Sequence, residues 1–201
     1  MLAPMAGVTD AGMRRIACRR GAALTFSEMV ASEMFLDGEE ESRLRADGCG
    51  VTPNAVQLVG WDARAMAETA CAVESTGAEL IDINMGRPAR RVAGKLAGAA
   101  LMQNLDTASR IVEAVAAAVK IPVAVKTRLG WDPSCRNAAE LARRAEAAGA
   151  KMITVHARTR CQLYNGAADW PALREIVAAV KIPVVVGGKL AALFHFAGEH
   201  S

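Results

Sequence analysis

The stretch TGAELIDIN at residues 76–84 is echoed by AGAKMITVH at residues 148–156. In both copies a helical segment ends, a glycine turns the chain, and a run of apolar residues begins. A second repeat, AAVKIPV, occurs at 117–123 and again at 178–184. Recurrence of the same helix-to-strand junction indicates repeated strand–helix units, which build an α/β fold with right-handed crossovers.

The predicted strands are short and almost continuously apolar, which is typical of strands buried on both faces of a parallel sheet. They cover residues 2–5, 22–29, 54–60, 80–84, 123–128, 152–156 and 183–187. Segments with helical periodicity lie between them, at 62–76, 106–119, 137–148 and 171–180. Asp106 and Asn137 are the expected N-caps of two of these helices.

Two architectures fit this alternation, an open doubly wound sheet and a (β/α)8 (TIM) barrel. No Gly-x-Gly-x-x-Gly motif follows an early strand, which weakens the dinucleotide-binding open sheet. Polar residues recur instead at the carboxyl ends of the predicted strands, namely Glu28, Gln57, Asn84, Lys126, Arg128 and His156. Because a TIM barrel gathers such ends onto one catalytic face, the sequence favours a TIM (β/α)8-type barrel.

This barrel is expected to be incomplete. About seven strands can be counted, whereas a TIM barrel has eight and usually needs about 250 residues. Residues 187–201 show no clear strand–helix pattern, so we expect a partial barrel over 1–186 followed by a divergent tail. The chain therefore looks incomplete at its C-terminus and slightly trimmed before Met1.

Composition narrows the class of protein. The chain has 201 residues, of which 52% are hydrophobic, and a formal net charge of +3. No apolar run approaches the ~20 residues of a membrane span, and no secretory signal is evident, so we expect a cytoplasmic protein without a membrane partner. Five scattered cysteines, without a Cys-x-x-Cys pair or clustered histidines, argue against disulfides and against a metal site.

Lys126 is the most informative single residue, because it follows Val-Ala-Val on a strand that is predicted to be buried. A buried ammonium needs a negative partner. That partner is either a cofactor that becomes anionic on reduction or a carboxylate, Glu28 or Asp82, across the barrel mouth. We favour the cofactor.

Other polar residues on the same predicted face carry both a functional and a structural interpretation. Gln57 can hydrogen-bond the carbonyl and ring N–H of a heterocycle, or a neighbouring loop. His156 can contact the polar edge of a cofactor, or be structural. Arg158 and Arg160 follow on a loop and can meet phosphate or a nucleobase, or be solvated.

Taken together, these residues resemble the tRNA-dihydrouridine synthases, and most closely the bacterial branch that is often described as nitrogen-regulation-like. The matching stretches are LAPMAGVTD (2–10), SEM (27–29), QLVG (57–60), DINMG-PA (82–89), K-R-GW (126–131), H-RTR (156–160) and Y-G-ADW (164–170). Each is short, but together they are highly specific and run in family order from residue 2 to about residue 186.

The resemblance implies an FMN-binding TIM barrel, a following helical domain that holds tRNA, and NADPH as the reductant. Pro4, Met5 and Ala6 match the flavin-contacting segment, and Gln57, Lys126 and His156 match further flavin contacts. Lys126 would stabilise negative charge on the reduced flavin. Asn84 matches a residue that orients the target uracil, which must leave its stack to reach the flavin. Arg128, Arg158 and Arg160 are the remaining candidates for contact with RNA.

Two departures from the family pattern stand out. The family's proton donor is a cysteine in NMGCPA, whereas this chain reads NMGRPA and places Arg87 there. A guanidinium does not donate a proton at neutral pH, so we expect impaired uridine reduction. The family's phosphate-binding residues are also not recognisable, since only Gly188 matches in the GGK stretch at 187–189, so we expect weak FMN retention.

Two alternatives remain open. One is an FMN barrel oxidoreductase that acts on a free pyrimidine, although H-RTR and Y-G-ADW suit a polynucleotide. The other is a non-catalytic tRNA-binding remnant, in which Arg87, Arg90, Arg91, Arg158 and Arg160 hold phosphate. We expect a monomer in either case.

Overall fold

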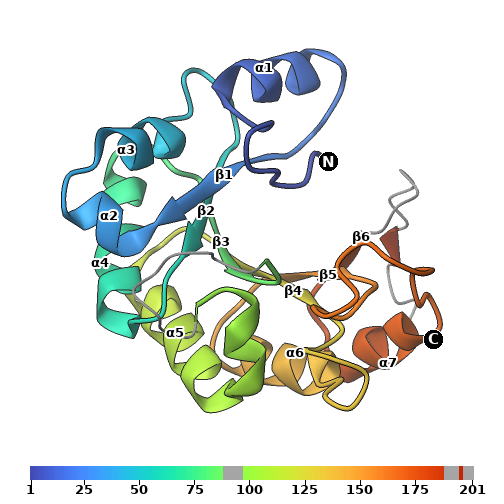
Figure 1. Ribbon diagram of the computed structural model, residues 1–201. Helices are drawn as coiled ribbons and strands as arrows, with labels where there is room; N and C mark the ends of the chain where they lie inside the picture. Colours follow the sequence, from blue (N-terminus) through green and yellow to red (C-terminus); the bar gives the residue numbers. More distant parts are fainter. Residues whose placement is uncertain (88–96, 188–194, 197–201) are drawn as a thin grey trace.

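The computed structural model describes residues 1–87 and 97–187 and the backbone of 195–196. Its centre is one sheet whose strands lie in chain order (Figure 1). Six parallel strands are β1 (Thr25–Ala31), β2 (Asn54–Val59), β3 (Leu80–Met85), β4 (Val123–Arg128), β5 (Met152–His156) and β6 (Val184–Gly187). A two-residue strand, β7 (His195–Phe196), pairs antiparallel with β6.

Helices follow the strands and cover one side of the sheet. Figure 1 shows α4 (Ala63–Ser75), α5 (Leu105–Ala118), α6 (Ala138–Ala147) and α7 (Ala172–Ala179) side by side along that side. Near the N-terminal end lie α1 (Ala11–Arg19), α2 (Ser32–Leu36) and α3 (Glu40–Ala46), and a 3-10 turn, η1 (Ala99–Gln103), precedes α5. Strand–helix alternation in this order makes the fold an incomplete TIM (β/α)8-type barrel, as the sequence predicts.

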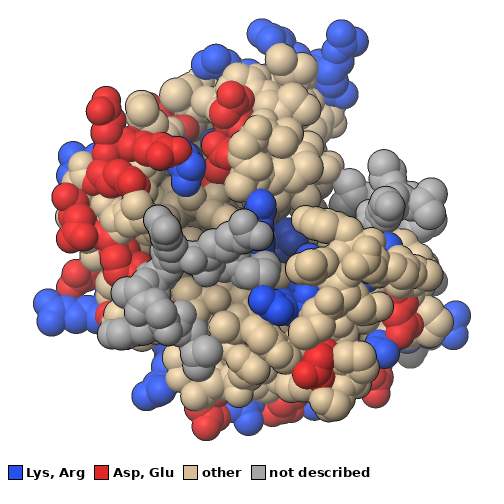
Figure 2. Space-filling view, viewed as in Figure 1, with Lys and Arg blue, Asp and Glu red and all other residues tan. Residues whose placement is uncertain are grey.

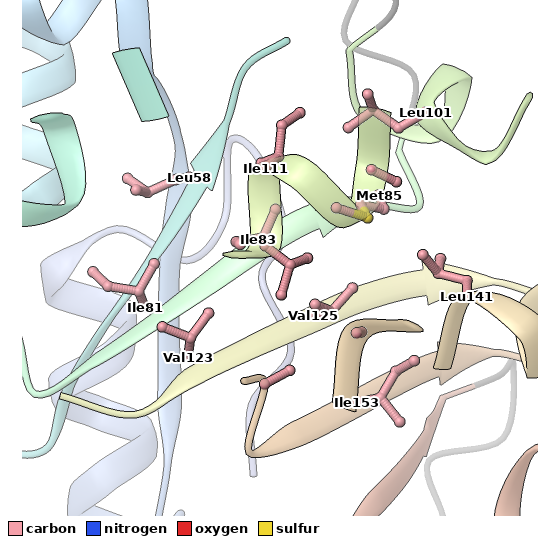
Figure 3. Packing of buried hydrophobic residues seen from close by; sticks show 14 of the residues in the cluster. Leu58, Ile81, Ile83, Met85, Leu101, Ile111, Val123, Val125, Leu141 and Ile153 are labelled. Atoms are coloured by element: carbon pink, nitrogen blue, oxygen red, sulfur yellow. The ribbon is translucent and has the colours of Figure 1, made fainter. Parts of the chain in front are cut away.

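The two faces of the sheet differ in chemistry, because successive side chains of a strand point to opposite faces. On β3 and β4 the residues Ile81, Ile83, Met85, Val123 and Val125 are buried against the helices (Figure 3). Ile111 of α5, Leu141 of α6 and Leu101 of η1 complete this layer. The alternate positions carry Asp82, Asn84 and Lys126, so the polar residues of these strands share the inner face of the barrel.

The internal repeat of the sequence corresponds to a repeated hydrogen-bonded junction. In the first copy, Glu74 Oε1 accepts the backbone N–H groups of Lys120 and Ile121 at 2.8 and 3.1 Å. In the second, Glu146 Oε1 accepts those of Lys181 and Ile182 at 2.8 and 3.0 Å. Glu74 belongs to α4 and Glu146 to α6. Each glutamate binds the chain at the start of the second strand after its own helix, which is β4 for Glu74 and β6 for Glu146.

Several expectations for local structure are wrong. Residues 2–5 do not form a strand but a single parallel bridge between Leu2 and Thr25. Pro4 has no N–H for a ladder, and the chain turns back on itself where Thr9 N–H meets Met5 O at 2.9 Å. Asp106 lies inside the first turn of α5, whose N-cap is Asn104.

The second N-cap expectation is confirmed in position. Asn137 is the N-cap residue of α6, but its side-chain oxygen accepts no capping bond, and its Nδ2 donates to Met102 O at 2.7 Å. Helices α1, α2 and α3 were not expected, and β7 lies in a tail for which no strand–helix pattern was recognised.

Candidate functional site at the carboxyl ends of the strands

A cavity of about 200 Å³ opens at the carboxyl ends of the parallel strands. The predicted site residues that line it are Pro4, Met5, Ala6, Gln57, Asn84, Arg87, Lys126, Arg128 and His156. Met29, Gly86 and Tyr164 complete the wall. Side chains from β1 to β5 and from three loops therefore meet in one place, as expected for the catalytic face of a TIM barrel.

A chain of side-chain hydrogen bonds crosses the floor of the cavity. Gln57 Nε2 donates to Asp82 Oδ2 at 2.5 Å, and Gln57 Oε1 accepts from Asn84 Nδ2 at 3.0 Å. Asn84 Oδ1 in turn accepts the backbone N–H groups of Gly86 at 3.0 Å and Arg87 at 2.9 Å. Gln57 and Asn84 are almost fully buried, so this chain orients both amides and fixes the turn after β3.

Lys126 and Asp82 are the charged pair of the inner face. Burial lowers the pKa of Lys126, the charge of Asp82 raises it, and the charges of Arg128 and Arg87 lower it further. Burial raises the pKa of Asp82 to about 6, against the opposing influence of the Gln57 hydrogen bond and of Lys126. Asp82 is thus the carboxylate that accompanies Lys126, and Glu28 is not, since its carboxylate accepts the N–H of Gly7 and lies 3.9 Å from Arg45 Nε.

Arg128 joins the cavity wall to two loops. Its Nε donates to Gly86 O at 2.8 Å, and its Nη1 donates to Thr159 O at 3.1 Å and Leu163 O at 2.8 Å. Its guanidinium also lies 5.7 Å from the ring centroid of Tyr164. The side chain is 6% exposed, so its position is fixed by these contacts.

His156 is uncharged at neutral pH. Burial lowers its pKa to about 4, and the positive charges of Arg128, Lys126 and Arg158 act in the same direction. The ring makes an edge contact with Tyr164, with centroids 6.1 Å apart, and its Nδ1 has no hydrogen-bond partner among the described residues. This nitrogen is therefore a buried polar atom without a partner in the described part of the chain.

The structure does not bring every predicted residue into the cavity. Arg158 is buried and donates from Nε and Nη2 to Gly166 O at 3.2 and 2.9 Å. Arg160 lies with its guanidinium 4.5 Å from the ring centroid of Trp131. Both arginines support the loop after β5 and lie outside the lining of the cavity. Gly188, Arg90 and Arg91 fall outside the described residues.

Sequence reasoning assigned no role to Met29, Gly86 and Tyr164. Each belongs to a stretch that carried the resemblance, SEM, NMG or Y-G-ADW, and membership in those stretches was the available signal. Tyr164 comes from a loop far along the chain, and no periodicity relates it to the strands.

The described residues also bear on metal binding and on membrane insertion. No group of three or more His, Cys, Asp or Glu residues there is arranged to hold a metal ion. No helix in that part of the chain is long and apolar enough to cross a membrane.

Comparison with solved structures supports the architecture alone. A putative phosphonomutase from Burkholderia cenocepacia J2315 superposes with a TM-score of 0.60 and 21% identity, over 89% of this chain and 75% of that one. A putative lyase/mutase from the same organism superposes with a TM-score of 0.59 and 17% identity, over 92% and 68% of the two chains.

Comparison of sequences is more specific. The family model described as dihydrouridine synthase (Dus) matches residues 1–195. A probable tRNA-dihydrouridine synthase of Rhodobacter capsulatus is 54% identical over 192 residues, which cover 94% of this chain and 59% of the relative. The tRNA-dihydrouridine synthase B of Pseudomonas syringae pv. tomato is 46% identical over 191 residues, covering 94% and 57%.

The chain thus spans somewhat more than half the length of these curated relatives. The family match nevertheless covers nearly all of it, including the six parallel strands of the sheet and every described residue that lines the cavity. The chain belongs to the dihydrouridine synthase family.

Proposed function

We propose that this chain is the FMN-binding barrel of a cytoplasmic tRNA-dihydrouridine synthase, which uses NADPH as reductant and acts on uridine in tRNA. The observation that carries the proposal is the convergence of Pro4, Met5, Ala6, Gln57, Asn84, Arg87, Lys126, Arg128 and His156 on one cavity. In this proposal residues 1–186 form the flavin-binding part, and residues 187–201 are a separate tail.

The chemistry of the cavity fits a flavin ring. Pro4, Met5 and Ala6 give one edge an apolar wall, and Met5 is 39% exposed and so available for contact. His156 and Lys126 line the same cavity, and Lys126 offers a positive charge. Gln57 is held in place by Asp82 and Asn84. Bound FMN would supply the hydride for uridine reduction, and Lys126 would stabilise the negative charge of the reduced cofactor.

Asn84 is proposed to orient the uracil. Its oxygen is occupied by the two backbone N–H groups of the following turn, so its contribution to a ligand must come from the amide nitrogen. One amide hydrogen is directed to Gln57 and the other to the sulfur of Met29 at 3.0 Å. Because sulfur is a weak acceptor, a uracil carbonyl can replace the Met29 sulfur as the acceptor of the second hydrogen at little cost. Uridine would reach this position as a flipped-out base.

Arg87 is proposed to lower the activity of the site. It holds the position of the family's proton-donating cysteine, and a guanidinium stays charged at all accessible pH values. Loss of a general acid typically costs ~10²–10⁴ in rate. The arginine also places a bulky side chain at the rim of the cavity, where it narrows access for the base.

Flavin binding provides the direct test of this assignment. Titration of the chain with FMN, followed by quenching of flavin fluorescence, should show saturable binding of one FMN per chain. Gln57→Leu and Lys126→Met should weaken binding by about tenfold or more, since each removes a polar contact to the ring. Lys151→Met, on the exposed surface beyond α6, is the matched control and should bind as the parent does. Equal binding by all four chains, or by none, contradicts the proposal.

A second candidate is favoured by Arg87 itself. If this arginine makes the site unable to turn over, the chain acts as a non-catalytic tRNA-binding protein. Steeply salt-dependent tRNA binding, without formation of dihydrouridine by the FMN-loaded protein, would support that alternative.

A further inference from the structure

The cavity carries more positive charge than its surroundings balance. Arg87, Lys126 and Arg128 all belong to its wall, and no Asp or Glu is among the described residues that line it. Figure 2 looks into a hollow at the centre of this face, where Lys and Arg atoms gather and Asp and Glu atoms are displaced toward the periphery. Asp82 lies beneath the floor, fully buried, and is engaged by Gln57.

The contacts of the two arginines leave their charge unneutralised, whereas the charge of Lys126 is balanced in part by Asp82. Arg128 donates to three carbonyl oxygens, which orient its guanidinium but carry no net charge. Arg87 is placed by two features of its backbone, since its N–H is held by Asn84 at 2.9 Å and its carbonyl accepts the N–H of Ala99 at 3.0 Å. Its side chain is exposed at the rim. Burial is the main cause that lowers the pKa of Lys126 and of Arg128, and nearby positive charges, Arg87 among them, act in the same direction.

The remaining polar groups of the wall suit a small negatively charged ligand. His156 lines the cavity and is uncharged at neutral pH, so its imidazole adds neither a positive nor a negative charge to the wall. Asn84 presents an amide N–H whose present acceptor is the sulfur of Met29. A cavity of about 200 Å³ has room for a small oxyanion or carboxylate. Charge-assisted hydrogen bonds from guanidinium and ammonium groups to such an anion are stronger than bonds to a neutral ligand.

We propose that Arg87, Lys126 and Arg128 form an anion-binding site at the mouth of the barrel, which takes an oxyanion or a carboxylate where the family's site takes a neutral base. Arg87 is the residue that sets this preference. The other two cations belong to stretches shared with the family, whereas a cysteine at this position would leave one positive charge fewer. The inference concerns the same cavity as the proposed function but does not require flavin, so the two can fail separately.

Calorimetric titration of the flavin-free chain with inorganic sulfate, in a low-chloride buffer at constant ionic strength, tests the site. We expect one sulfate per chain with a Kd on the order of 1 mM. Arg87→Gln and Arg87→Cys should weaken binding about tenfold or more, and Arg87→Lys should retain most of it. Arg110→Gln is the matched control, because Arg110 is an exposed arginine on α5 that bonds Thr107 and is not among the described residues that line the cavity.

Competition identifies the source of the anion. Displacement of sulfate by uracil-6-carboxylate, but not by uracil, assigns the site to a free carboxylate ligand. Displacement by a short single-stranded RNA in the parent chain, and not in Arg87→Gln, assigns it to the phosphodiester backbone of a polynucleotide. No saturable sulfate binding, or equal binding by the parent and Arg87→Gln, overturns the inference. Loss of FMN binding alone would overturn the proposed function and leave the anion site standing.

Discussion

Asn84 holds the backbone of Arg87: its side-chain oxygen accepts the Arg87 N–H at 2.9 Å, and it also accepts the N–H of Gly86 at 3.0 Å. The residue that is proposed to orient the base therefore also fixes the turn that carries the family's proton-donor position. One buried amide couples the position of the ligand to the position of residue 87, whichever side chain stands there.

The first prediction concerns this coupling. Asn84→Ala removes the acceptor of two N–H groups and a partner of Gln57, so it should lower the free energy of unfolding by about 1–3 kcal/mol. Asn84→Asp keeps the acceptor for the turn and should cost less. Denaturant unfolding measures both, with the exposed Asn165→Ala as the control. Equal stability of Asn84→Ala and the control would show that the amide does not hold the turn.

The second prediction concerns pH. Asp82 has a folded-state pKa raised from 3.8 to about 6, so its contribution to stability is fully present below pH 3.8 and is lost as pH rises toward 6. His156 has a pKa lowered from 6.5 to about 4, so its contribution is present above pH 6.5 and is lost as pH falls toward 4. The two effects oppose each other over the same range.

Single variants should separate these effects. Relative to the parent, Asp82→Asn should gain stability as pH rises from about 4 to about 6, because the cost of the buried carboxylate is gone. At about pH 4, His156→Gln should be more stable than the parent, because it lacks the buried imidazolium. This difference in the free energy of unfolding should shrink as pH rises to about 6. Urea unfolding across the range gives both slopes. Slopes of the same sign would contradict the assigned pKa directions.

The third prediction uses the internal repeat as its own control. Glu74→Ala and Glu146→Ala each leave two backbone N–H groups of a strand entry without their acceptor, and each should cost about 1–3 kcal/mol. Replacement by Gln retains an acceptor oxygen and should cost less in both copies. Unequal losses at the two sites would mean that the junctions are alike in sequence but not in energetics.

The fourth prediction concerns Arg128, which ties the turn after β3 to the loop after β5. Arg128→Met should release Gly86 O, Thr159 O and Leu163 O, and amide hydrogen exchange in residues 159–166 should accelerate. Exchange in α6, on the far side of β4, should not change. Unchanged exchange in the loop would show that other contacts hold it.

Much of this site was predictable because of simple geometry. Residues at the carboxyl ends of parallel strands must meet at one edge of the sheet, and the apolar runs that lead to Gln57, Asn84, Lys126 and His156 identified those ends. The apolar runs also made the strands recognisable. The two AAVKIPV repeats indicated two equivalent helix-to-strand junctions. The role of Glu74 and Glu146 was not, since a glutamate on a helix surface carries no sign of its distant partner.

What the sequence did not reveal depends on loops and on competition between partners. The sequence left Arg158 and Arg160 as loop cations without a known partner. In the structure Arg158 donates to Gly166 O, and the guanidinium of Arg160 lies over the ring of Trp131. Asn137 is the N-cap residue of α6, as expected, but its side chain donates to Met102 O, distant in sequence, and makes no capping bond. The sequence left both Glu28 and Asp82 as the possible carboxylate near Lys126. The register of the strands, which places Gln57 opposite Asp82, was needed to choose Asp82.

The central claim is that this cavity is a dihydrouridine synthase site in which Arg87 replaces the proton donor. Its most direct test measures dihydrouridine formed in unmodified tRNA by a chimera that joins residues 1–186 to the remaining part of the Rhodobacter capsulatus relative. Arg87→Cys should raise the rate by about 10²–10⁴, while Arg87→Ser, a small residue with a weaker acid, should gain far less. Equal rates for the parent and Arg87→Cys, with FMN bound in both, would contradict the account.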